Sequence, residues 1–456
     1  MDTRIRQLIF RVKSFSPEKI FLFCAIPLGL LFLIVHPIGE VPDEFTHLMR
    51  IYGISEGTLI AEQSETNNGG SKLPSGLKEI NQMLPEAGTY AEIGADLARP
   101  NSDDYEEYNY STAAIYNPVC YLPQVLGILI GRIFNMPYVA QAYLGRLLNL
   151  IVFLILVYFS IKYIPKFKHW LMFLALLPIS LQEASSLSPD ALAIGLCFFI
   201  IGLTAHLAYS EKGKMSICEL ILLYIVAIVI GFCKIVYLPL LLIYFIIPSE
   251  RFGSKKMKWI HGIAIAAVTI ALNLGWLLVS SRYLANPALA DVDSGVQLAH
   301  LTANPLRYLL IIAKTINARL TFYLTSGFGL NLGHFAIDLP SIFLYLSLIF
   351  ATLILSQNTE RLKIKPFERA VFILIPCIIC ILIFTSLYIQ WTAVDAPIID
   401  GVQGRYFLPF LPLLPFMLNN NHPKVHRSSP IRMRHIIIYL IIFNLTGIIK
   451  IFLANL

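Results

Sequence analysis

The sequence predicts an all-α, polytopic integral membrane protein, and three observations support this prediction. Apolar residues make up 57% of the 456 residues and charged residues only 14%, against about 25% charged in soluble domains. Apolar runs such as residues 20–37 approach the ~20 residues that span hydrocarbon, and about ten further segments have the same character. Backbone groups in lipid must be satisfied within the segment, which favours helices. We expect one membrane domain over residues 1–456, with about 10–12 transmembrane helices.

The first element is an N-terminal anchor. Five basic residues precede or begin the first apolar run: Arg4, Arg6, Arg11, Lys13 and Lys19. This resembles a signal peptide, but no small-residue cleavage site follows, so we expect the segment to remain uncleaved.

Basic loops set the expected orientation. Besides the N-terminus, the Lys/Arg-rich loops are residues 210–214, 250–258, 360–369 and 424–435. The Lys/Arg bias of short loops places them in the cytoplasm. Residues 38–112, with fourteen acidic residues against four basic ones, then form a large acidic loop on the outer face. Within this loop, residues 64–72 are expected to form a flexible tip.

Further outer loops follow from the same reasoning. They are residues 186–190 and 390–407, together with a second large loop over residues 281–337. Within that loop, Lys314 and Arg319 share one face of residues 308–324, which predicts an interfacial helix. Either residues 121–134 or part of residues 217–248 are expected not to cross fully.

A short helix is predicted directly after the first span. Pro42 suits a first helical position, and Gly53 or Gly57 suits an end. We expect it to lie on the membrane surface, with an apolar face (Phe45, Leu48, Met49, Tyr52) toward lipid and a polar face (Asp43, His47, Arg50) upward.

Three carboxylates are the candidate catalytic acids. Asp43 and Glu44 follow the first span directly, and Asp190 lies at the same outer level, together with Gln182 and Glu183. An acid at the membrane boundary is typical of a functional site. The alternative is that these side chains only complement helix dipoles.

Other polar residues are candidates for binding substrate: His47, Arg50, Tyr116, Asn117, Lys234, Gln403 and Arg405. Arg405 presents a planar fork that suits phosphate oxygens, with snorkelling as the alternative. Lys234 is an isolated cation in an apolar stretch, and it either snorkels or meets an anion. The tyrosines also fit a belt of interfacial anchors.

Cofactor expectations are limited. A divalent cation such as Mg or Mn is one option, with Asp43 and His47 as its candidate ligands. Cys377 and Cys380 form a CxxC inside an apolar run, which indicates ordinary membrane-helix residues. No GxxxxGK[ST] loop for nucleotide phosphates occurs, so an activated donor would already have to be across the membrane, as a lipid-linked one is.

Several stretches resemble a family of predicted bacterial membrane proteins of uncharacterised function, related to the GT-C class of membrane glycosyltransferases. They are "PDEFTHLMRIYGISEG", "YNPVCYLPQVLGILIGR", "GRLLNLIVF", "LLPISLQEASSLSPDALAIG", "CKIVYLPLLL", "GFGLNLGHFAIDLP" and "GVQGRYFLPFLPLL". The resemblance implies polyprenyl phosphate sugar donors and catalytic acids in the first outer loop. By position these would be Asp43 with Glu44, and Asp190 as a second acid, although "PDE" stands here in place of the separated Asp-x-Asp of some relatives.

The expected function is therefore a GT-C-like glycosyltransferase in the bacterial inner membrane. A sugar would pass from a polyprenyl phosphate donor to an envelope glycan such as O-antigen, a capsule or a teichoic polymer. The partners are then the donor, the glycan acceptor and the lipid bilayer, with no nucleic acid. Two alternatives are a flippase or transporter of lipid-linked sugars and a glycan polymerase or ligase.

Overall fold

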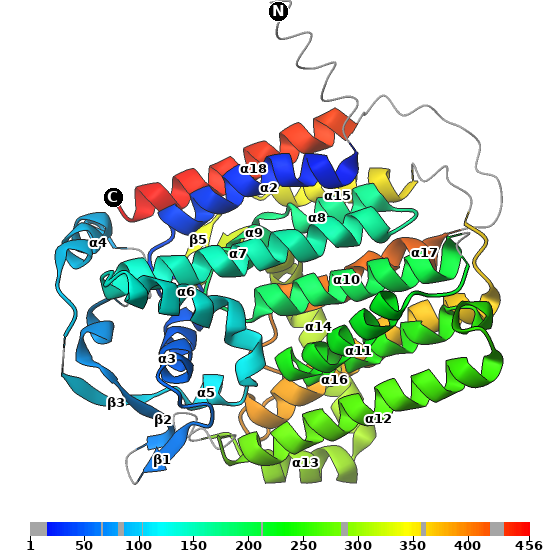
Figure 1. Cartoon of the computed structure of the whole chain (residues 1–456), viewed down its shortest axis with the longest axis horizontal. Coiled ribbons are helices and arrows are strands. Elements are labelled where there is room, and N and C mark those ends of the chain that lie inside the picture. Colours follow the sequence, from blue (N-terminus) through cyan, green and yellow to red (C-terminus); the bar gives the residue numbers. More distant parts are fainter. Residues whose placement is uncertain are drawn as a thin grey trace, which may run out of the picture.

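The computed structural model describes residues 16–64, 67–80, 86–102, 104–210, 213–283, 291–356, 362–419 and 433–456. It is a bundle of helices whose one end carries the chain between α2 and α6, and we call this the loop end (Figure 1). The N-terminal basic residues before Ser16 lie outside the described residues, as do residues 65–66 of the predicted tip and most of the basic loop 424–435.

Among the described residues, six helices are long and apolar enough to cross a membrane: α2 (Pro17–Val35), α7 (Tyr138–Tyr163), α10 (Asp190–Tyr209), α12 (Lys255–Ser280, extended by η5, Ser281–Tyr283), α16 (Pro366–Gln390) and α18 (Met433–Ala454). The prediction of an all-α polytopic membrane protein is confirmed. Among the six, α10 is the most deeply buried in the bundle. Its first residue, Asp190, therefore lies at the centre of the loop end.

Shorter or broken helices complete the bundle: α8 (Lys168–Ala175), α9 (Pro178–Ala184), α11 (Ile217–Cys233), η3 (Ile235–Ile246), η4 (Ser249–Phe252), α15 (Ile342–Ser356), η6 (Gly404–Leu413) and α17 (Leu414–Leu418). The 3₁₀ helices η3 and η6 contain Pro239, Pro409 and Pro412, which interrupt α-helical hydrogen bonding. Each has a cation at its start: Lys234 directly precedes η3, and Arg405 is the second residue of η6.

The helix α6 (Leu122–Ile133) does not traverse the bundle. A Cβ on Gly127 would touch the backbone of Leu144, and one on Gly131 would touch Gln141, so α6 runs back along the first turns of α7 toward the loop end (Figure 1). Residues 217–248 form a hairpin of α11 and η3 with Lys234 at its apex. The described helices α6, α11 and η3 are all shorter than the six long apolar ones, so which of the two segments fails to cross fully stays a prediction.

The loop end contains a small antiparallel sheet in the order β1-β2-β3. Its elements, with the short helices around them, are α3 (Glu44–Ser55), β1 (Glu62–Ser64), β2 (Asn67–Pro74), η1 (Ser75–Ile80), α4 (Thr89–Ala98), β3 (Tyr105–Asn109), α5 (Ser111–Ala114) and η2 (Pro118–Tyr121). The expectation of a flexible tip over residues 64–72 is wrong for its described part, because β2 pairs with β3 from Gly70 onward.

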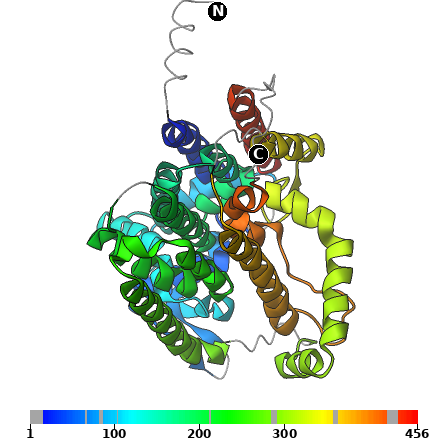
Figure 2. The same cartoon turned by 90° about the vertical axis from the view of Figure 1, so that its right-hand side faces the viewer.

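The second predicted outer loop also contains helices: α13 (Ser294–Ala303), α14 (Pro305–Phe328), and the short strands β4 (Asn331–Leu332) and β5 (Ile337–Asp338). In Figures 1 and 2, α14 runs steeply across the direction of α7 and α10. It is not among the described helices that are long and apolar enough to cross a membrane, and its interfacial position stays a prediction.

Candidate functional site

The turn after α2 is fixed by a buried arginine from α7. The guanidinium of Arg146 donates to the carbonyls of His36 at 2.6 Å and Pro37 at 2.8 Å, and it also bonds both carboxylate oxygens of Glu44. Gly39 makes this turn possible with φ of 96°, a conformation that glycine adopts without strain. The turn sets the start of α3, and with it the position of Asp43.

Glu44 has a structural role. Besides the two bonds from Arg146, its oxygens accept the backbone N–H groups of Gly39 at 2.9 Å and Leu187 at 3.0 Å. Burial alone would raise the pKa of Glu44, but the Arg146 charge and these hydrogen bonds hold it below its ordinary value. All its acceptor positions are taken, so Glu44 has no free oxygen with which to act as a catalytic base. This corrects the expected catalytic role of Glu44, which instead links α3 to α7 and to the chain before α10.

Asp43 is the accessible acid of the pair. It precedes α3 with φ of 65°, a left-handed conformation that costs energy outside glycine and is least unfavourable for Asn and Asp. Its side chain is 57% exposed, and Oδ2 lies 3.5 Å from Nη2 of Arg405. Of the two adjacent carboxylates, Asp43 is therefore the one that an incoming group can reach.

The expected surface orientation of α3 is wrong. Leu48 and Tyr52 on one face, and Arg50 on the other, are all fully buried, because the sheet and α6 pack around the helix. Arg50 donates to the carbonyls of Thr58 at 3.1 Å and Leu59 at 2.7 Å. It stabilises the turn after α3, and its expected role in binding substrate is corrected accordingly.

Arg405 lies among three carboxylates from different elements. Nη1 donates to Glu183 of α9 at 2.8 Å, whereas Nη2 and Nε lie 3.5 Å from Asp43 and Asp190, respectively. The side chain is 5% exposed, and Nε has no hydrogen-bond partner in the described part of the chain. The guanidinium of Arg405 is therefore held tightly at Nη1 by Glu183 and only loosely at Nε and Nη2 by the two aspartates.

Lys234 supplies a second cation. Its Nζ lies 2.7 Å from Oδ1 of Asp190 and 4.4 Å from the ring centroid of Tyr406. Tyr237 of η3 donates to the carbonyl of Tyr406 at 3.1 Å, which ties the two 3₁₀ helices together. Asp190 thus bridges Lys234 and Arg405. We call Asp43, Glu183, Asp190, Lys234 and Arg405 the charge cluster.

An aromatic wall with a histidine borders the charge cluster. Nδ1 of His47 lies 2.8 Å from the hydroxyl of Tyr121, and Tyr116 contacts the imidazole edge-on, with 5.7 Å between ring centroids. Burial lowers the pKa of His47 to about 4, although Asp43 and Asp190 act in the opposite direction. His47 is therefore neutral at physiological pH.

Two further binding candidates have mainly local contacts. The side chain of Asn117 accepts the N–H of Val119 and caps η2. Gln403 precedes η6, and its Oε1 is buried without a hydrogen-bond partner among the described residues.

The structure gives no complete ligand set for a metal. Within the described ranges, no three His, Cys, Asp or Glu side chains form a group that could hold an ion. Glu40, which also lies in this turn, pairs with His36 at 2.7 Å. Asp43 and His47 therefore lack a third ligand here.

The structure thus brings together Asp43, His47, Tyr116, Asp190, Lys234 and Arg405 from five separate segments. The sequence places Glu183 at this level and Tyr121 among the tyrosines before a membrane entry without selecting either, and sequence reasoning missed Arg146 and Tyr406 as site residues. An arginine inside an apolar run, as in "YLGRLLNLIVF", is the signal that indicates Arg146. Tyr121 has no such signal, because tyrosines are common at membrane boundaries.

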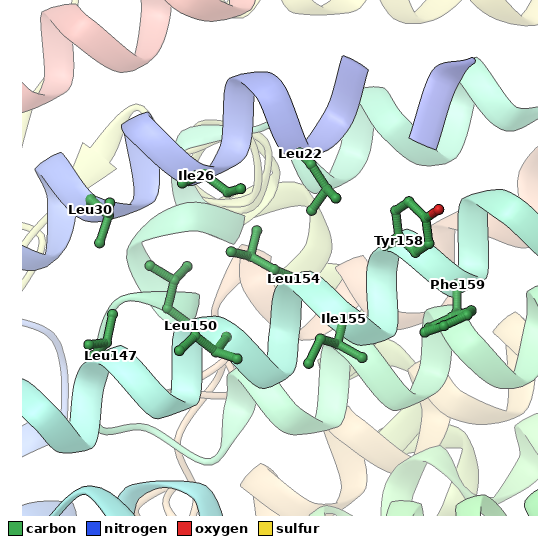
Figure 3. Close-up of a pocket in the computed structure, with 10 residues that line it drawn as sticks. Leu22, Ile26, Leu30, Leu147, Leu150, Leu154, Ile155, Tyr158 and Phe159 are labelled. Atoms are coloured by element: carbon green, nitrogen blue, oxygen red, sulfur yellow. The ribbon is translucent and has the colours of Figure 1, made fainter. Parts of the chain in front are cut away.

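A separate hollow lies between α2 and α7 (Figure 3). It measures about 400 Å³, and its walls include Leu22, Leu30, Leu147 and Phe159. All its lining residues are apolar or aromatic, so it offers surface for hydrocarbon and no group for chemistry.

Comparison with known proteins gives one match. A family model described as "Predicted membrane protein (DUF2142)" matches residues 26–414, a range that includes every member of the charge cluster. No curated protein and no solved structure matches the chain.

Proposed function

The chain belongs to the DUF2142 family of predicted membrane proteins, and we propose that it is an integral membrane glycosyltransferase. Its donor is a polyprenyl phosphate sugar, and its acceptor is a cell-envelope glycan on the outer face of the inner membrane. The charge cluster is the active site.

One observation carries the proposal: the accessible carboxylate of Asp43 pairs only loosely with the buried Arg405, whose Nε donates no hydrogen bond among the described residues. Nε of Arg405 lacks a hydrogen bond among the described residues, and the carboxylates beside Nε and Nη2 are 3.5 Å away. This edge of a guanidinium suits two oxygens of a phosphate. A phosphate arriving there replaces Asp43, the exposed partner of Arg405, and leaves its carboxylate free.

The residues then have distinct roles in one displacement. The acceptor hydroxyl oxygen bonds to the anomeric carbon of the sugar, while the bond from that carbon to the phosphate oxygen breaks. Asp43 takes the hydroxyl proton as general base. Arg405 and Lys234 stabilise the charge on the departing polyprenyl phosphate. A single displacement inverts the anomeric centre.

The sidedness of the bundle supports an outer site. Lysines gather at the end opposite the charge cluster, for example Lys255 and Lys256 at the start of α12 and Lys168 at the start of α8. Basic residues favour the cytoplasmic side of a membrane, and this supports an outer position for the loop end, where lipid-linked sugars are consumed.

The test uses the purified full chain with a radiolabelled polyprenyl phosphate sugar and membrane glycan extract. A transferase releases free polyprenyl phosphate, and the acceptor gains one sugar. A flippase in proteoliposomes moves the lipid without releasing it, which would overturn the proposal. Acceptor mass rising by whole glycan repeats would indicate a polymerase or ligase instead.

A further inference from the structure

The segment before α6 enters the bundle and then turns back along α7. Gln124 at the start of α6 donates to the carbonyls of Leu187 and Ser188, both at 3.4 Å. The first turn of α6 therefore reaches the level of Asp190, and α6 then returns beside α7. The segment thereby brings Tyr116 and Tyr121 to His47 beside the charge cluster.

Tyr121 is held rigidly at the point where this segment turns. It ends η2 and immediately precedes α6, and its side chain is fully buried. Its ring lies 5.8 Å from the imidazole of His47 and 6.4 Å from the ring of Tyr116, measured between centroids. The bond from its hydroxyl to Nδ1 of His47 is the contact that links the segment to α3 at the site.

We propose that Tyr121 is a positioning residue that fixes the tautomer of His47, so that Nε2 carries the proton and acts as a hydrogen-bond donor at the charge cluster. A neutral imidazole has one donor and one acceptor nitrogen. If the Tyr121 hydroxyl donates to Nδ1, then Nε2 is the N–H. In the opposite tautomer the hydroxyl would accept from Nδ1–H, and Nε2 would carry no proton although Asp43 and Asp190 act electrostatically on the ring.

The charges around His47 favour the proposed tautomer. The groups that act on it are Asp43 directly before its own helix, Asp190 of α10, Lys234 at the α11–η3 apex and Arg405 of η6, with Tyr116 and Tyr121 from the returning segment. The two carboxylates accept hydrogen bonds, and the two cations oppose protonation of the ring. A neutral ring with an Nε2–H donor carries no positive charge beside the two cations and still offers a hydrogen-bond donor to the carboxylates.

This assignment has a consequence for the chemistry. A protonated Nε2 cannot ligate a metal or take a proton, and the lone pair of Nδ1 is engaged by the Tyr121 hydroxyl, so His47 acts neither as a metal ligand nor as a second base. Next to Asp43, it donates a hydrogen bond to an oxygen of the incoming acceptor and orients it. This role in orienting the acceptor rests on the proposed function, whereas the tautomer does not.

The test is nitrogen NMR of the full chain labelled with ¹⁵N-histidine, with His47→Gln identifying the His47 signals. At neutral pH the wild-type protein should show a protonated Nε2 and an unprotonated Nδ1. Tyr121→Phe, which removes only the hydroxyl, should yield a mixture of tautomers. An unprotonated Nε2, a charged ring at pH 7, or an unchanged tautomer in Tyr121→Phe would each overturn the proposal.

A second measurement separates positioning from a merely structural role. In the donor-release assay, His47→Gln keeps a neutral N–H donor and should retain about a tenth or more of wild-type kcat, whereas His47→Ala should lose about 10²-fold. Equal loss in both variants, with thermal unfolding unchanged, would contradict the donor role. If wild type itself releases no polyprenyl phosphate, the proposed function fails while the NMR result stands.

Discussion

At the residue scale, two adjacent carboxylates have opposite environments. Glu44 is fully buried with every oxygen bonded, whereas Asp43 is exposed in a left-handed conformation beside Arg405. Backbone strain of this kind persists where the surroundings enforce it, and such positions cluster at functional sites. We infer that Glu44 stabilises the turn that holds Asp43 in place.

Glu44→Gln should therefore destabilise the protein. The substitution leaves the Arg146 charge buried without a partner, a loss of about 3–5 kcal/mol for a buried pair, and thermal unfolding in detergent measures it. The matched control is Glu56→Gln, which breaks the partly exposed pair with Arg132 and should cost about 1 kcal/mol or less. Wild-type stability in Glu44→Gln, together with lost transfer, would point to catalysis by Glu44 instead.

Arg405→Lys should impair transfer with the fold retained. A lysine keeps the charge beside Glu183 but loses the two-pronged donor edge, so kcat should fall about 10²-fold. Arg307→Lys is the control, because Arg307 is half exposed and pairs with Asp395 at 3.1 Å, away from the charge cluster. Wild-type turnover in folded Arg405→Lys would exclude the phosphate role.

At the element scale, the site is made where helices begin or break. Asp190 begins α10, Lys234 is the apex between α11 and η3, and Arg405 lies at the start of η6. Broken helices leave backbone groups and side chains at one depth, and such breaks are tolerated only where protein or water surrounds them. The returning helix α6 adds the aromatic wall.

Gly127→Ala should displace α6. A Cβ there would lie 2.5 Å from the backbone of Leu144 and Gly145, too close for any side-chain adjustment, and overpacking of this kind costs about 1–3 kcal/mol. Thermal unfolding checks the prediction. Gly94→Ala in α4, where nothing lies within 4 Å of the added Cβ, should be neutral or slightly stabilising. Equal stability of the two variants would mean that α6 is not packed against α7.

The sequence predicts the helices better than their packing. Apolar runs identify the helices, but of the roughly 10–12 expected spans only six described helices are long and apolar enough to cross a membrane, and other apolar runs form shorter helices. The acids and cations of the site are identifiable because charge is rare in such runs. The surroundings of α3 are not predictable in this way. Its 3.6-residue pattern fits a surface helix, but the sheet and α6 bury its polar face as well, and these contacts are distant in sequence.

Some of the site residues are likewise predictable from the sequence, and others are not. Asp43, Asp190, Lys234 and Arg405 were chosen for their charge at one level, and the structure brings them together. Nothing in the sequence separates Asp43 from Glu44, because their difference depends on Arg146 from another helix. Tyr121 becomes a candidate only once its bond to His47 is visible.

At the scale of the whole molecule, the two ends of the bundle contain different segments of the chain. The C-terminal residues lie at the loop end, where Asn455 donates to Glu40 at 3.1 Å and Phe452 stacks on Tyr90. The start of α2 lies at the other end (Figure 1), close to the start of α8, where Lys168 lies 3.9 Å from Glu18. The start of α2 and the C-terminal residues are therefore at opposite ends of the bundle.

Labelling of single cysteines in a cysteine-free background should show this polarity. Glu92→Cys in α4 should react with a membrane-impermeant maleimide in intact cells, and Lys256→Cys in α12 only after permeabilisation. The reason is that basic loops remain in the cytoplasm. The reverse pattern would place the charge cluster on the cytoplasmic face and exclude an outer-face transferase.

The most direct test of the central claim is polyprenyl phosphate release by Asp43→Asn. The substitution keeps the size of the side chain and removes the base, so release should fall to background while thermal unfolding stays as in the wild type. Asp395→Asn, an exposed aspartate at the same end, should release product at the wild-type rate. Wild-type release by folded Asp43→Asn would contradict the account.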